Sequence, residues 1–150
     1  MAAEIVDVAE AVYAAFQSTY GHEYIVKRAW SVSTLWSEWG TESEEKAERV
    51  RLFVVPVAAP RSELSRGFEQ VSPTISIAVC KKTDDLCEQN DLISLAATIL
   101  KTQRRLLYET DSGNAKVTTI EHVPFSDALI EKGIIASLIQ LTFRMEVAHG

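Results

Sequence analysis

The sequence predicts a single α+β domain over residues 1–150, with a mainly antiparallel sheet of about four to five strands and two helices packed on one side. Apolar residues recur at helical spacing in two segments and at alternate positions in several shorter ones. The composition is 47% hydrophobic and 24% charged, which provides enough apolar surface for an ordered core. A long β-hairpin arm and a long C-terminal strand are the two unusual features expected of this sheet.

The first helix is expected from about Ala3 to Tyr20, where Gly21 stops it. Its apolar stripe consists of Ile5, Val8, Ala9, Val12, Ala15, Phe16 and Tyr20. Residues 23–33 then alternate as a strand with two mixed faces, which is typical of an edge or an interface. Residues 34–48 contain two tryptophans and an acidic run, and we expect a solvated loop or short helix there.

Two apolar strands, Val50–Val57 and Ile75–Lys81, are expected to pair as an antiparallel hairpin. The connection between them, residues 58–73, is about 16 residues long, whereas hairpin loops usually take about 2 to 5. Its mixture of charged and apolar side chains favours a contact arm over a flexible linker.

A second helix is expected from Asn90 or Asp91 to about Tyr108, followed by a turn at residues 111–114 and a strand at residues 116–123. A short helical turn at residues 126–132 leads into the final strand. One face of that strand carries Ser137, Ile139, Leu141, Phe143, Met145 and Val147. Residues 134–147 extend over roughly 45 Å, and an end that outruns its own sheet is most simply managed by pairing with another chain.

Residue patterns of catalytic or metal sites were not found, so we expect no enzyme activity, no cofactor and no metal. The histidines His22, His122 and His149 lie far apart, and the acidic group Asp84, Asp85, Glu88 and Asp91 lacks the spacing of a calcium loop. Cys80 and Cys87 are expected to be reduced structural thiols. Ser126 fits a helix N-cap, and the tryptophans Trp30, Trp36 and Trp39 fit core or interface packing.

The formal charge of −6 argues against electrostatic binding of nucleic acid, because such binding needs lysine and arginine to neutralise phosphates. Charged residues interrupt the most apolar segment, so no membrane span is expected. The N-terminus lacks the basic start of a signal peptide, which favours a soluble protein of the cytoplasm.

The order of these elements resembles the tail terminator or tail completion proteins of tailed bacteriophages. The resemblance rests on the opening helix, the strands Arg49–Pro56 and Thr74–Lys82, the long loop that contains Pro60–Arg66, the helix from Asp91 to Tyr108, and the terminal strand. It implies a virion protein, assembled in the bacterial cytoplasm, that forms a ring of six copies on the head-proximal end of the tail tube. The partners implied are the tail tube protein and the neck or connector protein. Residues 34–48 match no feature of that family, and contact with a sheath, with the tube protein or with nothing stays open for them.

Such a ring ends tube polymerisation and leaves a channel through which DNA passes without specific binding. Six copies at −6 each would carry about −36, and an acidic channel repels phosphate. The resemblance gives the long loop the role of an arm to a neighbour, which makes Arg61, Glu63, Arg66 and Phe68 candidate interface residues. The end of the final strand adds Arg144 and Glu146.

Two alternatives stay open. One is another neck component, such as a head-tail joining or stopper protein, which shares the small size and ring assembly. The other is a small dimeric α+β domain that binds a ligand or acts as an enzyme, with a pocket between sheet and helices.

Overall fold

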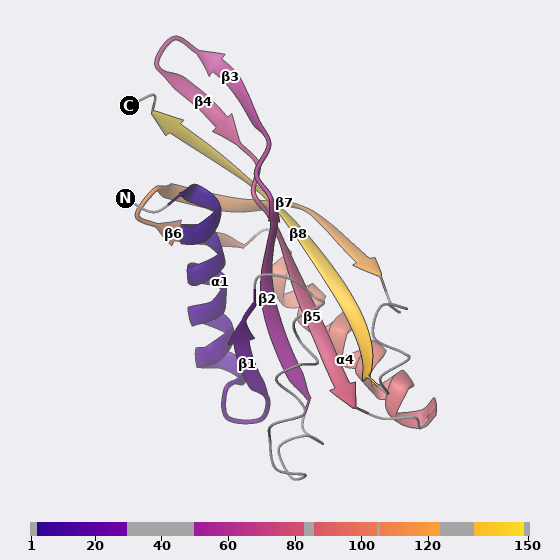
Figure 1. Ribbon diagram of the computed structural model, residues 1–150. Coiled ribbons are helices and arrows are strands. Elements are labelled where there is room, and N and C mark those ends of the chain that lie inside the picture. Colours follow the sequence, from indigo (N-terminus) through magenta and orange to yellow (C-terminus); the bar gives the residue numbers. More distant parts are fainter. Residues whose placement is uncertain (1–2, 30–49, 83–85, 105, 124–133, 149–150) are drawn as a thin grey trace.

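A computed structural model of the chain describes residues 3–29, 50–82, 86–104, 106–123 and 134–148. Two helices and eight strands follow in the order α1 (Glu4–Tyr20), β1 (Ile25–Arg28), β2 (Arg51–Ala58), β3 (Arg61–Ser65), β4 (Phe68–Val71), β5 (Thr74–Lys82), α4 (Leu86–Gln103), β6 (Leu107–Thr110), β7 (Gly113–Val123) and β8 (Ile134–Ala148) (Figure 1). The predicted α+β class is confirmed, and the sheet has more strands than expected.

The long final strand is confirmed as β8, and it organises the sheet. Along one edge it pairs first with β5, from Ile134 to Thr142, and then with β4, from Met145 to Ala148. Along the other edge it pairs with β7, from Leu138 to Arg144. The sequence indicated that the end of β8 needs a strand to pair with, and β4 of the same chain pairs with it.

Strand β1 is shorter than the predicted strand at residues 23–33, and it runs parallel to β2 in a sheet whose other pairs are antiparallel. Residues 30–33 lie outside the described part of the chain, as does the predicted connection at residues 34–48. The predicted helical turn at residues 126–132 also lies outside it.

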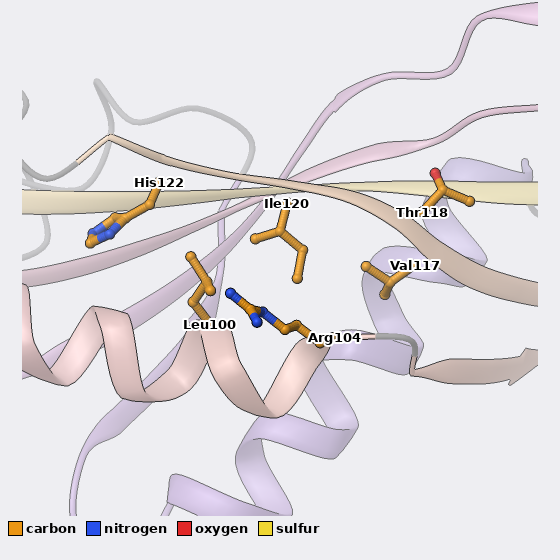
Figure 2. A pocket seen from close by; sticks show the side chains of 6 residues that line it. All are labelled: Leu100, Arg104, Val117, Thr118, Ile120 and His122. Atoms are coloured by element: carbon orange, nitrogen blue, oxygen red, sulfur yellow. The ribbon is translucent and has the colours of Figure 1, made fainter.

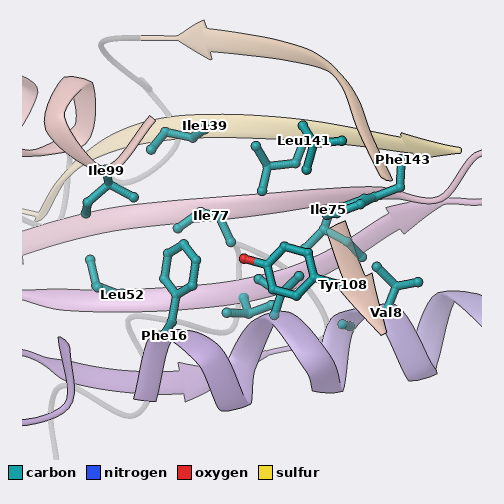
Figure 3. Close-up of a cluster of buried hydrophobic side chains, with 14 of the residues drawn as sticks. Val8, Phe16, Leu52, Ile75, Ile77, Ile99, Tyr108, Ile139, Leu141 and Phe143 are labelled. Atoms are coloured by element: carbon teal, nitrogen blue, oxygen red, sulfur yellow. The ribbon is translucent and has the colours of Figure 1, made fainter. Parts of the chain in front are cut away.

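Both helices pack on the same face of the sheet and share one core with it (Figure 3). Helix α1 buries Val8, Ala9, Val12 and Phe16, which belong to the predicted stripe. Helix α4 contributes Leu92, Ala96 and Ile99. The strands supply Leu52, Val54, Ile75, Ile77, Val79, Ile139, Leu141 and Phe143, so the predicted inward face of β8 is confirmed.

Both predicted ends of the second helix are wrong. Helix α4 begins at Leu86, so Asn90 and Asp91 lie inside it, and it ends at Gln103, while residues 107–110 form strand β6. The Tyr108 hydroxyl donates a hydrogen bond of 2.7 Å to Gln103 Oε1 inside the core, and the Tyr108 ring packs edge-on against Phe143. Pairing of β6 with β7 therefore replaces the last helical turn that Leu106 and Leu107 suggested.

The opposite face of the sheet is also buried in the body of the protein. Phe53, Val55, Ala78, Cys80 and Ala136 form a second apolar cluster there. Cys80 is a free, fully buried thiol, as the sequence predicted for it, and burial raises its pKa to about 12. Strands β2 and β5 are thus apolar on both faces, and this explains their nearly continuous hydrophobic sequence.

The predicted long β-hairpin arm is confirmed in the 16-residue connection between the hairpin strands. Two further strands, β3 and β4, fill most of it and extend the β2–β5 hairpin into a longer one. Gly67 allows the tight reversal between them because its φ is 92°, a conformation that other residues rarely adopt. We call residues 61–71, which comprise β3, β4 and their turn, the arm.

Candidate functional site

The arm continues the sheet beyond the level of the helices, beside the C-terminal end of β8 (Figure 1). Strand β4 joins it to β8 through the pairs Phe68 with Ala148 and Gln70 with Glu146. Strand β3 lies outside β4 and ends the strand order on this side of the sheet. The arm is therefore built on the longest strand of the protein.

On the face turned away from the helices, which we call the outer face, the arm and β8 bring together three of the predicted interface residues. Phe68 lies on this face and is 51% exposed. Arg144 and Glu146 share the face because they alternate with the core residues of β8, and their charged groups lie 3.8 Å apart. Lys116 pairs with Arg144 across the sheet. An open hollow of about 370 Å³ is lined by Asn114, Lys116, Arg144 and Glu146.

Arg61 lies on the opposite face of the arm, where it contacts the start of α1. Its Nη1 and Nη2 donate hydrogen bonds of 3.1 and 2.9 Å to the two carboxylate oxygens of Glu4. Its Nε donates a further bond of 2.9 Å to Glu69 Oε1, on the neighbouring strand. One guanidinium group thus connects β3, β4 and α1.

The ionisation of these groups reflects the cluster. The hydrogen bond from Arg61 is the main reason why the pKa of Glu4 lies below its usual value, and the Glu4 backbone amide adds to the effect. The same bonds to Glu4 and Glu69 raise the pKa of Arg61 further above its ordinary range. Glu4 and Arg61 are therefore both charged at neutral pH.

A second hydrogen bond joins α1 to the hairpin formed by β6 and β7. The Ser112 hydroxyl, in the turn between β6 and β7, donates a hydrogen bond to Asp7 Oδ2 in the first half of α1. The start of α1 thus holds the arm through Glu4 and the β6–β7 hairpin through Asp7. Both carboxylates lie in the first turn, where the helix dipole favours negative charge.

The six predicted interface residues therefore fall into separate places. Phe68, Arg144 and Glu146 share the outer face, whereas Arg61 is hydrogen-bonded to α1 on the other side. Arg66 is exposed in the turn, and the side chain of Glu63 lies outside the described part. Sequence reasoning placed Glu69 in the arm without a partner and missed Glu4 and Gln70. Glu4 is 57 residues from Arg61 in the sequence and offered no signal.

A groove of about 420 Å³ lies between α4 and β7 (Figure 2). Arg104 extends between Leu100 and Ile120, and His122 lies at one end. His122 Nε2 is 2.8 Å from Ser137 Oγ, but Ser137 is fully buried. A nucleophile must reach its substrate, so this pair serves as a hydrogen bond within the fold.

No candidate metal site was found in residues 3–29, 50–82, 86–104, 106–123 and 134–148. They contain no group of three or more His, Cys, Asp or Glu side chains that could hold a metal ion. His22 is exposed, as expected for a surface histidine. His149, Asp84, Asp85, the three tryptophans, Ser126 and the side chains of Cys87 and Glu88 lie outside the described part. No described helix is both long and apolar enough to span a membrane.

Comparison with known proteins supports the fold alone. No protein-family model and no curated protein matches this chain. Among solved structures, 24 chains match, so the fold is not peculiar to this sequence. One of them, a protein whose name states no function, has a TM-score of 0.57 and 14% identity, and the match covers 100% of this chain and 97% of the other.

Proposed function

We propose that this protein is a tail terminator of a tailed bacteriophage, in which six copies form a ring on the head-proximal end of the tail tube. The ring stops tube polymerisation and offers a surface to the neck or connector protein. The observation that carries the proposal is the arm, a preformed hairpin that projects beyond the helices with an exposed phenylalanine near its tip. A projection of this kind is suited to contact with another subunit.

The arm is held in place before any partner arrives. Strand β4 pairs with β8, and Arg61 ties β3 to α1 through Glu4. A contact segment that is already ordered loses little conformational entropy on binding, which favours assembly. This feature supports a structural protein over a domain whose binding depends on a mobile loop.

The outer edge of the arm offers a further means of assembly. Strand β3 pairs only with β4 among the described residues, so its other edge is open to a strand of a neighbour. Exposed edges of this kind commonly pair between chains. In a ring, every copy supplies the same edge, and this gives the contact a natural repeat.

The charge of the chain fits a channel for DNA. A net charge of −6 per copy gives a ring of about −36, and such a ring repels the phosphates that pass through it. The protein would act in the virion, at the junction of tail and neck, after assembly in the bacterial cytoplasm. A sheath, where the tail has one, is a further neighbour.

The test uses the purified full-length chain and the tail tube protein of the same phage. Electron microscopy of negatively stained samples should show rings, and addition of the chain to polymerising tube protein should shorten the tubes and leave one end capped. A chain that forms no ring and leaves the tube length unchanged would refute the proposal. Rings that bind connector protein but never tubes would point to a stopper or joining protein.

A variant pair makes the test specific for the arm. Phe68→Asp places a charge on the outer face of the arm and should reduce tube capping. Ser94→Glu, which adds the same charge on the exposed side of α4, is the control and should cap normally. Equal capping by both variants would show that the arm takes no part.

A further inference from the structure

Strand β7 has an open edge beyond the point where β6 leaves it. On one side, residues 116–123 of β7 run along β8. On the other side, β6 pairs only with residues 113–116, so residues 119–123 have no strand beside them there in the described part of the chain. Backbone N–H and C=O groups along such an edge are free to bind a further strand. We call residues 119–123 the β7 edge.

The β7 edge borders the groove between α4 and β7. The volume of this groove, about 420 Å³, lies within the range of about 300 to 1,000 Å³ that is usual for ligand pockets. Leu100 from α4 and Ile120 from β7 both line it, and both side chains are partly buried (Figure 2). A strand that paired with the β7 edge would therefore have an apolar groove beneath it for every second side chain.

Arg104 gives this groove a positive charge. Its side chain extends between Leu100 and Ile120 and is exposed. The described residues that line the groove include no carboxylate, although the whole chain has a net charge of −6. An acidic side chain of an incoming strand would meet a cation here.

The other face of the β7 edge carries the opposite charge. Ile120 pairs with the core residue Leu141 and lies on the side of the helices. Glu121 pairs with Gln140, so it lies on the outer face, where it is exposed. Side chains alternate along a strand, so a strand added to this edge would present one set to Arg104 and the other set to Glu121.

We propose that the β7 edge and its groove bind an extended segment of a partner protein, which adds to the sheet as a further strand. On the side of the helices this segment carries apolar residues and an acidic residue that pairs with Arg104. On its other face it carries a basic residue that pairs with Glu121. Backbone hydrogen bonds give affinity in complexes of this kind, and the side-chain pockets give specificity. The inference goes beyond the terminator proposal and does not depend on ring formation.

The β7 edge of a second copy is a poor occupant of the same site. Antiparallel pairing of two such edges about their centre would place the Glu121 residues of the two copies opposite each other. Like charges directly opposite each other destabilise a pair of strands. A partner with a basic residue at this position replaces that repulsion with attraction.

Two labelled peptides of equal composition test the proposal. The matched peptide, Thr-Leu-Lys-Glu-Thr-Val-Thr, has Leu, Glu and Val on one face and Lys on the other. The exchanged peptide, Thr-Leu-Glu-Lys-Thr-Val-Thr, swaps the two charges and keeps the apolar residues in place. Fluorescence anisotropy with the full-length chain should show that the matched peptide binds more than about tenfold more tightly. Equal affinity for the two peptides, or binding of neither, would overturn the proposal.

Variants of the chain assign the preference to the two charges. Arg104→Glu should remove the preference, and the double variant with Glu121→Arg should reverse it. Lys101→Glu makes the same charge change on an exposed residue of α4 outside the groove, and it should keep the original preference. Circular dichroism confirms that each variant is folded. A preference that survives in the double variant would overturn the proposed site.

Methylated peptides test whether the segment binds as a strand. Alternate amides of an extended peptide point to opposite sides, so only one of the two alternating sets faces the β7 edge. N-methylation of one set should abolish binding, and N-methylation of the other set should leave it nearly unchanged. Binding that survives both methylations would overturn the pairing. Self-association of the chain that the matched peptide inhibits would assign the edge to a second copy and overturn the choice of partner.

Discussion

Arg61 and Glu4, which are 57 residues apart in the sequence, form a forked ion pair with N–O distances of 3.1 and 2.9 Å. Two parallel hydrogen bonds between a guanidinium and a carboxylate fix orientation as well as distance. The first turn of α1 therefore contributes to the direction of the arm, together with the pairing of β4 with β8. Arg61 is occupied by this ion pair. Candidate interface residues of the arm are therefore those on its outer face and in its turn.

Removal of the Glu4 charge should loosen the arm. Glu4→Gln keeps the size of the side chain but cannot form the forked ion pair, so we expect trypsin to cleave after Arg66 about two to five times faster, in line with the modest strength of exposed ion pairs. The core does not depend on this pair, so the melting temperature should hardly change. Glu121→Gln is the control. Equal cleavage rates would show that β4–β8 pairing alone holds the arm.

The ion pair between Arg61 and Glu4 should weaken in acid. The hydrogen bond from Arg61 lowers the pKa of Glu4 in the folded protein. The stabilisation that the ion pair gives to the arm is therefore fully present above the usual pKa of 4.5, and it is lost as the pH falls through the lower pKa of the folded protein. Hydrogen-exchange protection of the arm amides, corrected for intrinsic rates, should stay level from neutral pH to about 4.5 and fall below it. In Glu4→Gln this acid step should be absent. An identical step in both proteins would assign it to another carboxylate.

Tyr108 should contribute to stability through its hydroxyl. Tyr108→Phe removes the donor of the 2.7 Å bond and leaves Gln103 Oε1 buried without it, which should cost about 1 to 2 kcal/mol in urea unfolding. Tyr13→Phe, at a partly buried position of α1, should cost less. A loss below a few tenths of a kcal/mol in Tyr108→Phe would mean that Gln103 finds another donor.

Gly67 should be intolerant of a side chain for conformational reasons alone. Its φ is 92°, and an added Cβ would meet nothing within 4 Å. Gly67→Ala should therefore destabilise the hairpin by about 1 kcal/mol or more, whereas Gly67→Asn should cost less because asparagine enters this region more readily. Amide exchange in β3 and β4 measures the effect. Equal protection in all three proteins would contradict it.

Long periodic segments were predictable from the sequence, and short polar ones were not. Helix α1 and strand β8 each bury one face, so their periods are visible over many residues. Strands β3 and β4 consist mostly of charged and polar residues, because much of the arm is exposed to solvent. Hydrophobic alternation, the signal used to find strands, is weak there.

Tertiary contacts explain the remaining errors. Leu106 and Leu107 extend the apolar stripe of α4 in the sequence, yet pairing of β6 with β7 overrides that local preference. Phe68, Arg144 and Glu146 could be chosen as candidate interface residues from the segments in which they lie. The register of β4 and β8, which places them on one face, could not be predicted. The partner of Arg61 on α1 follows only from the folded chain.

Strand β8 has a mechanical consequence. Its first part is hydrogen-bonded to β5 in the body, and its last part is hydrogen-bonded to β4 in the arm. A pull on the arm along its length would therefore load these ladders in shear, and many hydrogen bonds would share the force. Stretching in this direction would be opposed by hydrogen bonds in both the body and the arm, because β8 is one continuous strand that runs through both.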